Sequence, residues 1–348
     1  MIVPNLPPAV CGVYDYTRKL AENLHVAAQW RLLCPSDGEP WPRASHAKVS
    51  RDSASLSRAL LDFQPDVVAL QYTCYGYADN GVPGWLADGL ETFSRTHKAR
   101  LAVFFHELSY DGPPWRRAHW RKPKQDALAL RLCSLADAVL TGVPQWKQDL
   151  QLASRREVIF APVPANIEPG PRHTRGGELR LGIFGLPQSR KRALMVHGKL
   201  LKTLHRKGVA FTLSLMGKGA GQATPGPEEA ALCAKLGAFP LSASEGSDSA
   251  ISAALARCDA LLSPYTCDEL WKSGAAMAAL AHGCALIAVG TPRLGAPPSL
   301  TYSSKTVEML QVVNPASLRD CGLAGLKWYE GNSGWPRAAE AWRAALAH

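Results

Sequence analysis

The chain has 348 residues, of which 47% are hydrophobic and 20% charged, and its formal net charge is +10. This length suits two domains, and the composition is that of a globular protein rather than a disordered one. No run of eighteen apolar residues occurs, and Pro4, Pro7 and Pro8 interrupt the opening, so we expect neither a transmembrane helix nor a signal peptide. The charge is spread along the chain, which fits phosphate-bearing ligands or an anionic membrane surface at least as well as nucleic acid. Because no nucleic-acid-reading motif occurs, we expect no nucleic-acid partner.

Nine cysteines are dispersed along the sequence, without a Cys-x-x-Cys pair and without histidines at metal-ligand spacing. This usage is typical of reduced, mostly buried thiols. We therefore expect a cytoplasmic protein without a structural zinc ion.

The first half of the sequence alternates short apolar runs with amphipathic stretches. Buried strands are predicted at 66–72, 100–107, 137–143 and 157–163. Helices are predicted at 13–28 and 53–63, where apolar residues recur at helical spacing. Strand–helix–strand alternation indicates a parallel sheet that is covered on both faces.

A Pro- and Gly-rich segment interrupts this pattern and predicts a linker at 166–178. The alternation then restarts, with strands predicted at 179–186, 211–217, 259–265 and 285–290 and helices at 192–207, 247–257 and 274–282. The predicted fold class is α/β, with two Rossmann-like, doubly wound domains, 1–165 and 179–334, that face a cleft. Ligands of such sheets bind at the carboxyl ends of the strands, so the cleft is the expected site.

Two segments of the first half carry candidate functional residues. Gly12 lies between a Pro-rich turn and an amphipathic helix, where a phosphate or an acceptor could approach the free N–H groups of the helix start. An ordinary strand-to-helix turn explains Gly12 equally well. His106 and Glu107 follow a buried strand and would point into the cleft, although a lone histidine is more often a structural residue.

The first predicted strand of the second half ends at a candidate phosphate site. Gly185 ends the strand, and Arg190, Lys191 and Arg192 follow at the start of the next helix. Cations at a helix N-terminus oppose the macrodipole and destabilise the helix unless an anion offsets them. The arrangement therefore favours a diphosphate site over a solvated basic turn.

A second candidate site follows the predicted strand at 259–265. Asp268 and Glu269 occupy the loop, and Ser273 and Gly274 open an Ala-rich helix. Because the Ala-rich face is expected to pack on the sheet, the loop and the amides at the helix start are the candidate ligand contacts.

Taken in this order, the four segments resemble those of the retaining glycosyltransferases of the GT-B fold, in the large family-four group. Residues 7–21 resemble the opening pattern P-P-x-x-G-G-V-x-x-Y-x-x-x-L-A, with Cys11 in place of the first glycine. The M-G-K-G of 216–219 resembles the V-G-x-G turn of that family, and 261–290 resembles its donor-sugar loop and following helix. The resemblance covers nearly the whole chain.

The resemblance implies transfer of a sugar from a nucleotide-sugar to an acceptor hydroxyl in polysaccharide or glycoconjugate assembly, with retention and without a metal or other cofactor. Domain 179–334 would bind the donor and domain 1–165 the acceptor, and the helix at 335–348 would pack back on the first domain. The slow step would be departure of the nucleoside diphosphate, whose charge the cations neutralise.

The candidate residues then take specific roles. His106 and Lys191 are the expected catalytic residues, because His106 would hydrogen-bond the donor sugar and Lys191 would neutralise the leaving group. The other expected contacts to the donor diphosphate are Gly185, Arg190, Ser273, Gly274 and Ala275. Asp268 and Glu269 would bind sugar or ribose hydroxyls, and Ala278 stands where many members of the family carry a second glutamate.

A segment of the first half interleaves Trp115 and Trp120 with Arg116, Arg117 and Arg121. This combination suits docking on an anionic membrane surface, which would place the protein at the inner face of the cell membrane. A solvated loop and recognition of an acidic acceptor are alternatives. The expected partners are therefore a nucleotide-sugar donor, a glycan or lipid-linked acceptor and an anionic membrane.

Two other functions stay open at this point. A catalytically degenerate, sugar-nucleotide-binding subunit of a glycan-assembly complex would fit Ala278 and the short first apolar run, Met1 to Val3. A nucleotide-sugar epimerase shares the two-domain fold but needs more acid–base groups than His106 and Glu107. A dinucleotide-dependent dehydrogenase is disfavoured, because no G-x-G-x-x-G motif follows a predicted strand.

Overall fold

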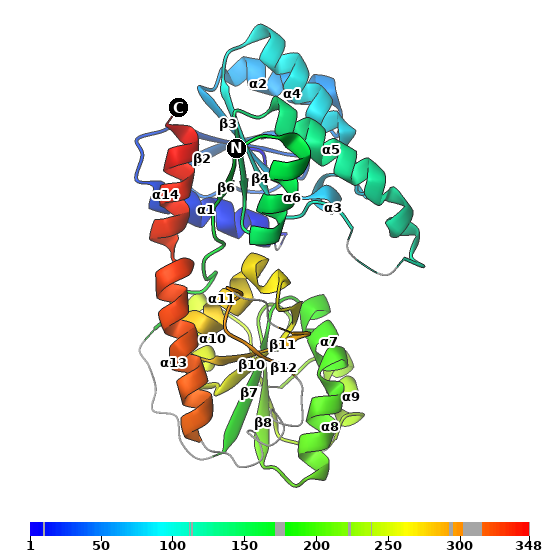
Figure 1. Ribbon diagram of the computed structural model, residues 1–348, viewed down its shortest axis with the longest axis vertical. Coiled ribbons are helices and arrows are strands. Elements are labelled where there is room, and N and C mark those ends of the chain that lie inside the picture. The colour runs from blue at the N-terminus through cyan, green and yellow to red at the C-terminus, as the bar shows by residue number, and fades with distance from the viewer. Residues whose placement is uncertain are drawn as a thin grey trace. The chain divides into compact units, whose positions relative to one another are not determined.

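The structure is a computed structural model (Figure 1) that describes residues 1–9, 11–110, 112, 114–170, 178–221, 224–237, 239–291, 295–301 and 315–347. The chain divides into two compact units. Unit 1 comprises Met1–Pro162 and Trp335–His348, and unit 2 comprises Val163–Gly334. Among the described residues, no helix combines the length and the apolar character needed to cross a bilayer.

Unit 1 is built on parallel strands with helices between them. The strands are β1 (Trp30–Cys34), β2 (Ala44–Lys48), β3 (Val67–Tyr72), β4 (Arg100–Phe105), β5 (Ala138–Thr141) and β6 (Val158–Phe160). The helices are α1 (Gly12–Leu24), α2 (Ser53–Phe63), α3 (Cys74–Tyr77), α4 (Gly84–Thr96), the 3-10 helix η1 (Arg117–Arg121), α5 (Lys122–Leu135), α6 (Pro144–Ser154) and α14 (Trp335–Leu346).

A single residue near the chain start joins the two sheets of unit 1. Strands β1 and β2 pair with each other, and β3, β4, β5 and β6 form a second sheet. Ile2 makes parallel bridges to Leu33 of β1 and to Leu70 of β3. The strands therefore lie side by side in the order β2, β1, Ile2, β3, β4, β5, β6. Numbered along the chain from Ile2, this is 3-2-1-4-5-6-7, which begins as a Rossmann sheet does.

The last helix packs within unit 1. The Trp342 side chain of α14 is fully buried, its ring stacks on Phe104 of β4 with centroids 5.9 Å apart, and its Nε1 donates to the Tyr16 hydroxyl at 2.9 Å. Tyr16 lies on α1, which α14 contacts (Figure 1). These contacts fix α14 against α1 and β4.

Unit 2 contains one six-stranded parallel sheet. Its strands are β7 (Leu179–Phe184), β8 (Phe211–Met216), β9 (Leu241–Ser244), β10 (Ala260–Thr266), β11 (Ala285–Val289) and β12 (Leu300–Thr301). Its helices are α7 (Pro187–Val196), α8 (Gly198–Arg206), α9 (Pro227–Ala234), α10 (Asp248–Arg257), the 3-10 helix η2 (Glu269–Lys272), α11 (Gly274–Ala281) and α13 (Pro315–Asn332).

The strand order of unit 2 locates its expected ligand site. The order β9-β8-β7-β10-β11-β12 is 3-2-1-4-5-6 in chain order, that of a doubly wound nucleotide-binding sheet. The chain reverses its direction of winding between β7 and β10, and ligands bind outside the carboxyl ends of the strands at such a point. The predicted α/β class with Rossmann-like sheets is therefore confirmed.

One predicted helix of unit 2 is wrong in its bounds. The pattern predicted a single helix at 192–207, whereas α7 begins at Pro187 and α8 follows after His197. Proline at the first position suits a helix start, because its missing N–H would have no partner there. The His197 side chain points inward and its Nε2 lies 2.7 Å from the Ser263 carbonyl oxygen. Of the predicted linker, 171–177 lie outside the described residues.

Candidate functional site

Two glycine loops meet at the carboxyl ends of β7 and β8. Gly185 follows β7, and Gly217 follows β8 with a positive φ of 111°. A Cβ atom on Gly217 would lie 2.5 Å from the carbonyl oxygen of Gly185, so no larger residue fits there. Glu245, which follows β9, accepts hydrogen bonds from the N–H groups of Gly219 (2.6 Å) and Gly221 (3.2 Å), and these bonds lower the pKa of its carboxyl group.

The structure places Arg190 differently from the prediction. Its guanidinium is fully buried, and Nε and Nη2 donate to the two carboxylate oxygens of Glu229 at 2.8 and 3.1 Å. Nη1 donates to the carbonyl oxygens of Gly185 (2.6 Å) and Lys218 (3.0 Å). The bonds to the two carbonyl oxygens hold the two loops together. Because Glu229 already balances the charge of Arg190, a diphosphate would have to displace these protein contacts to bind the guanidinium.

Lys191 lies on the exposed side of α7. Its ammonium group donates to Glu228 at 2.8 Å, which raises the pKa of Lys191, and the two side chains are 51% and 82% exposed. An ion pair this exposed contributes little to stability. A phosphate could therefore replace Glu228 as the partner of Lys191 at small cost.

Arg192 is the third cation of the predicted diphosphate site, and the sequence predicted no individual contact for it. Its guanidinium carbon lies 5.8 Å from the centre of the Tyr265 ring, and Tyr265 is the last residue but one of β10, which ends at Thr266. The cation–π contact places a positive charge beside the carboxyl end of β10. The clustering of three cations was visible in the sequence, but which of them faces β10 depends on the helix start at Pro187.

The loop after β10 is held by its own glutamate. Glu269 accepts hydrogen bonds from the N–H (3.0 Å) and hydroxyl (2.9 Å) of Thr266 and pairs with Lys272 at 3.3 Å. Although burial opposes ionisation, the Thr266 hydrogen bonds and the Lys272 charge lower the pKa of Glu269. Glu269 would have to give up these contacts to bind a sugar hydroxyl, as the sequence predicted. Asp268, the other predicted sugar contact, is half-buried at the start of η2.

The start of α11 presents backbone donors. The buried Ser273 hydroxyl caps the helix by accepting from Ala276 N–H at 3.1 Å. Within the described ranges, the N–H groups of Gly274 and Ala275 have no acceptor. The Asn166 backbone N–H lies 3.4 Å from the Gly274 carbonyl oxygen, and its buried Oδ1 has no hydrogen-bond partner in the same part of the chain. No pattern in the sequence could have singled out Asn166.

His106 is a neutral, packed residue at the carboxyl end of β4. Its Nε2 lies 2.8 Å from Oε1 of the buried Gln71, and its ring centroid is 4.4 Å from Phe104 and 5.1 Å from Tyr16. Burial lowers the pKa of His106 to about 3, so the imidazole is uncharged at neutral pH. These contacts suit a structural histidine, and any contact with a sugar would be a hydrogen bond of the neutral ring.

Two further candidates of unit 1 lie at the carboxyl edge of its sheet. Glu107 accepts a hydrogen bond from the Thr73 hydroxyl at 3.0 Å, which joins the ends of β4 and β3. Gly12 is the first residue of α1, and no atom lies within 4 Å of the place where its Cβ would be. Neither packing nor φ requires a glycine at this position. The open space beside the helix start leaves room for a ligand.

The segment predicted to touch a membrane is exposed. Trp115 and Trp120 are 79% and 78% exposed, and the side chains of Arg116, Arg117 and Arg121 are exposed as well. As for metals, no group of three or more His, Cys, Asp or Glu side chains that could hold an ion occurs among the residues described.

The sequence matches no protein-family model and no curated protein. Solved structures match the fold across the chain. WaaG, a glycosyltransferase involved in lipopolysaccharide biosynthesis, is 12% identical with a TM-score of 0.57 over 99% of this chain and 97% of its own. A protein assigned as a UDP-N-acetylglucosamine 2-epimerase of Listeria monocytogenes is 11% identical (TM-score 0.56; 99% and 94%). Os79 T291V of O. sativa, solved with UDP, is 11% identical (TM-score 0.55; 99% and 99%). At these identities the likeness concerns the fold, which is the GT-B fold that the sequence resemblance predicted.

Proposed function

We propose that this protein is a glycosyltransferase that moves a sugar from a nucleotide-sugar donor to an acceptor hydroxyl. The observation that carries the proposal is that Arg192 of α7 contacts the carboxyl end of β10 at Tyr265, where the α11 N–H groups that lack an acceptor in the described part of the chain follow the same strand. Similar structures include a glycosyltransferase and a complex with UDP. Unit 2 would accordingly bind the donor, and unit 1 the acceptor.

The donor diphosphate is held by charge and by backbone donors. The N–H groups of Gly274 and Ala275 lie at the positive end of the α11 dipole, which favours an anion. Lys191 exchanges Glu228 for a phosphate oxygen, and Arg192 reaches a second one from above Tyr265. Arg190 is a positioning residue in this scheme, since it fixes the Gly185 loop beside the diphosphate.

Catalysis follows from the charge that the leaving group acquires. As the glycosyl bond breaks, its electron pair moves onto the diphosphate and the sugar gains oxocarbenium character. The acceptor oxygen then bonds to the anomeric carbon, and its proton passes to the departing diphosphate. Lys191, Arg192 and the α11 amides stabilise that charge more strongly than they stabilise the intact donor. The proposal includes retention because the sequence resembles that of retaining glycosyltransferases. It includes independence from metal ions because these groups supply the positive charge that a metal provides in other enzymes.

The remaining predicted contacts are to the sugar and the acceptor. Asp268 binds sugar hydroxyls, and the neutral His106 donates or accepts a hydrogen bond at the sugar. Gly12 leaves space for the acceptor at the start of α1. Trp115 and Trp120, with the neighbouring arginines, hold the protein at the inner face of the membrane, where a lipid-linked acceptor of polysaccharide or glycoconjugate assembly would be found.

The test is product analysis with a panel of nucleotide-sugars and lipid-linked or soluble glycan acceptors. Acceptor-dependent release of nucleoside diphosphate, with the anomeric configuration of the product preserved, is the expected result. This release should fall at least about tenfold in Lys191→Ala and Arg192→Ala, whereas Lys327→Ala, which removes an exposed cation on α13, should match the wild type.

Two outcomes would contradict the proposal. Interconversion of the nucleotide-sugar without release of the diphosphate would indicate an epimerase, the function assigned to one of the similar structures. Saturable donor binding without any product would indicate the sugar-nucleotide-binding subunit instead.

A further inference from the structure

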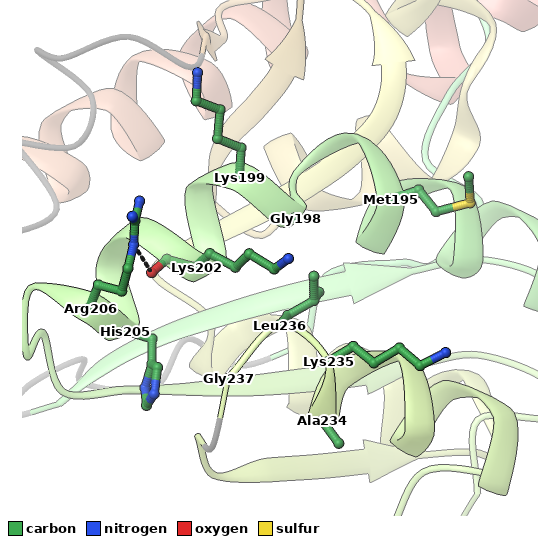
Figure 2. A pocket seen from close by; sticks show the side chains of 10 residues that line it. All are labelled: Met195, Gly198, Lys199, Lys202, His205, Arg206, Ala234, Lys235, Leu236 and Gly237. Atoms are coloured by element: carbon green, nitrogen blue, oxygen red, sulfur yellow. Dashed lines mark hydrogen bonds between the residues drawn. The ribbon is translucent and has the colours of Figure 1, made fainter.

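Unit 2 carries a basic groove away from the proposed donor site (Figure 2). The groove has a volume of about 680 Å³ and lies between α8 and the end of α9. Its charged lining residues are all cations, namely Lys199, Lys202, Arg206 and Lys235, and His205 lies beside them. In the part of the chain that the structure describes, no carboxylate lines it.

The two walls of the groove come from different segments. Lys199, Lys202 and Arg206 are spaced by three and four residues on α8, so they lie on one face, about 4.5 and 6 Å apart along the axis. Lys235, at the end of α9, supplies the opposite wall, and Figure 2 shows Leu236 between Lys202 and Lys235. All four cations are exposed, whereas Leu236 is only 9% exposed and forms part of the floor.

Helix electrostatics explain only part of this cluster. Cations in the last turn of a helix are favoured by the macrodipole, which accounts for Arg206 at the end of α8. The C-terminal end of α9 likewise favours Lys235, its C-cap residue. Lys199, in contrast, lies in the first turn of α8, where the dipole disfavours a cation, and Lys202 lies in the middle of the helix, where the dipole has little effect. Like charges gathered in one concavity repel one another, and a bound anion would offset that repulsion.

The groove is distinct from the donor site. Its lining residues Arg206 and Gly237 precede β8 and β9 in the chain, so they lie toward the amino ends of these strands. The donor site lies at the carboxyl ends of β7 and β10. An anion in the groove would therefore not be in contact with the reacting diphosphate.

We propose that this groove binds a linear acidic glycan, whose negative groups recur along the chain as the α8 cations do. The choice of a glycan among polyanions rests on the proposed function. Single-stranded nucleic acid is less suited, because its binding sites offer aromatic rings for base stacking and no Phe, Tyr or Trp lines the groove within the described residues. A bilayer surface is less suited as well, because it meets projecting aromatic and basic side chains rather than a concavity.

The experiment measures binding of fluorescein-labelled polygalacturonate to the full chain by anisotropy, at low and at high salt. Neutral dextran, an oligo-dT strand and phosphatidylglycerol vesicles are measured alongside. The groove variant is Lys199→Glu/Lys202→Glu/Lys235→Glu. The matched control is Arg58→Glu/Lys98→Glu/Lys327→Glu, which changes the net charge equally at exposed positions outside the groove. Binding of UDP to each protein is the separate readout of the donor site.

We expect the wild type to bind polygalacturonate but not dextran, with affinity that falls as salt rises. The groove variant should bind at least about tenfold more weakly, the control within about twofold of the wild type, and UDP affinity should be unchanged in all three proteins. The inference is overturned if the wild type does not bind polygalacturonate, if the groove variant and the control lose affinity equally, or if oligo-dT or vesicles show the groove-dependent binding instead. If the wild type binds polygalacturonate but does not bind UDP, the result counts against the proposed function and not against the groove.

Discussion

The guanidinium of Arg190 lies against the carboxylate of Glu229, with Nε 2.8 Å from Oε1 and both side chains buried. Through the same guanidinium, the carbonyl oxygens of Gly185 and Lys218 are held at the ends of β7 and β8. The pair therefore links α7, α9 and two loops of the proposed donor site.

Removing one member of this pair should be costly. Arg190→Met leaves Glu229 as a buried charge without its partner, and we expect the free energy of unfolding to fall by about 3–5 kcal/mol. Urea unfolding measures this loss. The double variant Arg190→Met/Glu229→Met should be more stable than Arg190→Met, because no buried charge remains. If the double variant is less stable than the single one by the full cost of Glu229→Met, the pair is not coupled as described.

The hydrogen bond from Trp342 to Tyr16 should contribute to the stability of unit 1. Tyr16→Phe leaves the buried Trp342 Nε1–H without an acceptor, which costs about 1–3 kcal/mol. Thermal and urea unfolding should show this loss, whereas Tyr75→Phe, at an exposed tyrosine, should change stability by less than about 0.5 kcal/mol. Equal effects of the two substitutions would show that α14 is not fixed by this bond.

His106 should make the protein less stable in acid. The pKa of His106 is lowered from 6.5 to about 3, so the unfolded chain takes up a proton there below about pH 6.5 and the folded chain does not until near pH 3. The free energy of unfolding therefore falls as the pH drops through this window. His106→Gln cannot titrate and should lose less stability between pH 7 and pH 4, as measured by urea unfolding. Parallel curves for the two proteins would mean that His106 is protonated in the fold.

The exposed Trp and Arg side chains before α5 should direct membrane binding. Sedimentation with phosphatidylglycerol vesicles should decrease strongly in Arg116→Glu/Arg117→Glu/Arg121→Glu, and phosphatidylcholine vesicles should bind neither protein well. Trp115→Ser/Trp120→Ser should weaken binding even at high salt, because the aromatic contribution is not screened. Sedimentation that is unchanged in both variants would remove the membrane from the list of partners.

Hydrophobic patterning predicted the elements on which the site is built. The apolar runs before Glu107, before Gly185 and before Thr266 are strands with nearly the predicted bounds, because central parallel strands are buried on both faces and stay apolar throughout. The Rossmann order of unit 2 could not be read from the sequence, since strand order depends on pairing between distant segments. The edge strand β2 (Ala44–Lys48) was not predicted, because it is polar and half-exposed and so has no apolar run to mark it.

The roles of individual site residues were harder to predict than their positions. Arg190, Lys191 and Arg192 are consecutive, and their side chains diverge around α7 to Glu229, to Glu228 and to Tyr265. Those directions depend on where the helix begins and on acidic residues almost forty positions later in the chain. A local motif carries neither piece of information.

Calorimetric titration with UDP and other nucleoside diphosphates tests the central claim most directly. We predict saturable binding to the wild type for at least one of them, weakened at least about tenfold in both Lys191→Ala and Arg192→Ala and unchanged in Lys327→Ala. If both α7 variants bind every nucleoside diphosphate as the wild type does, or if the wild type binds none, then the ends of β7 and β10 do not hold a donor diphosphate.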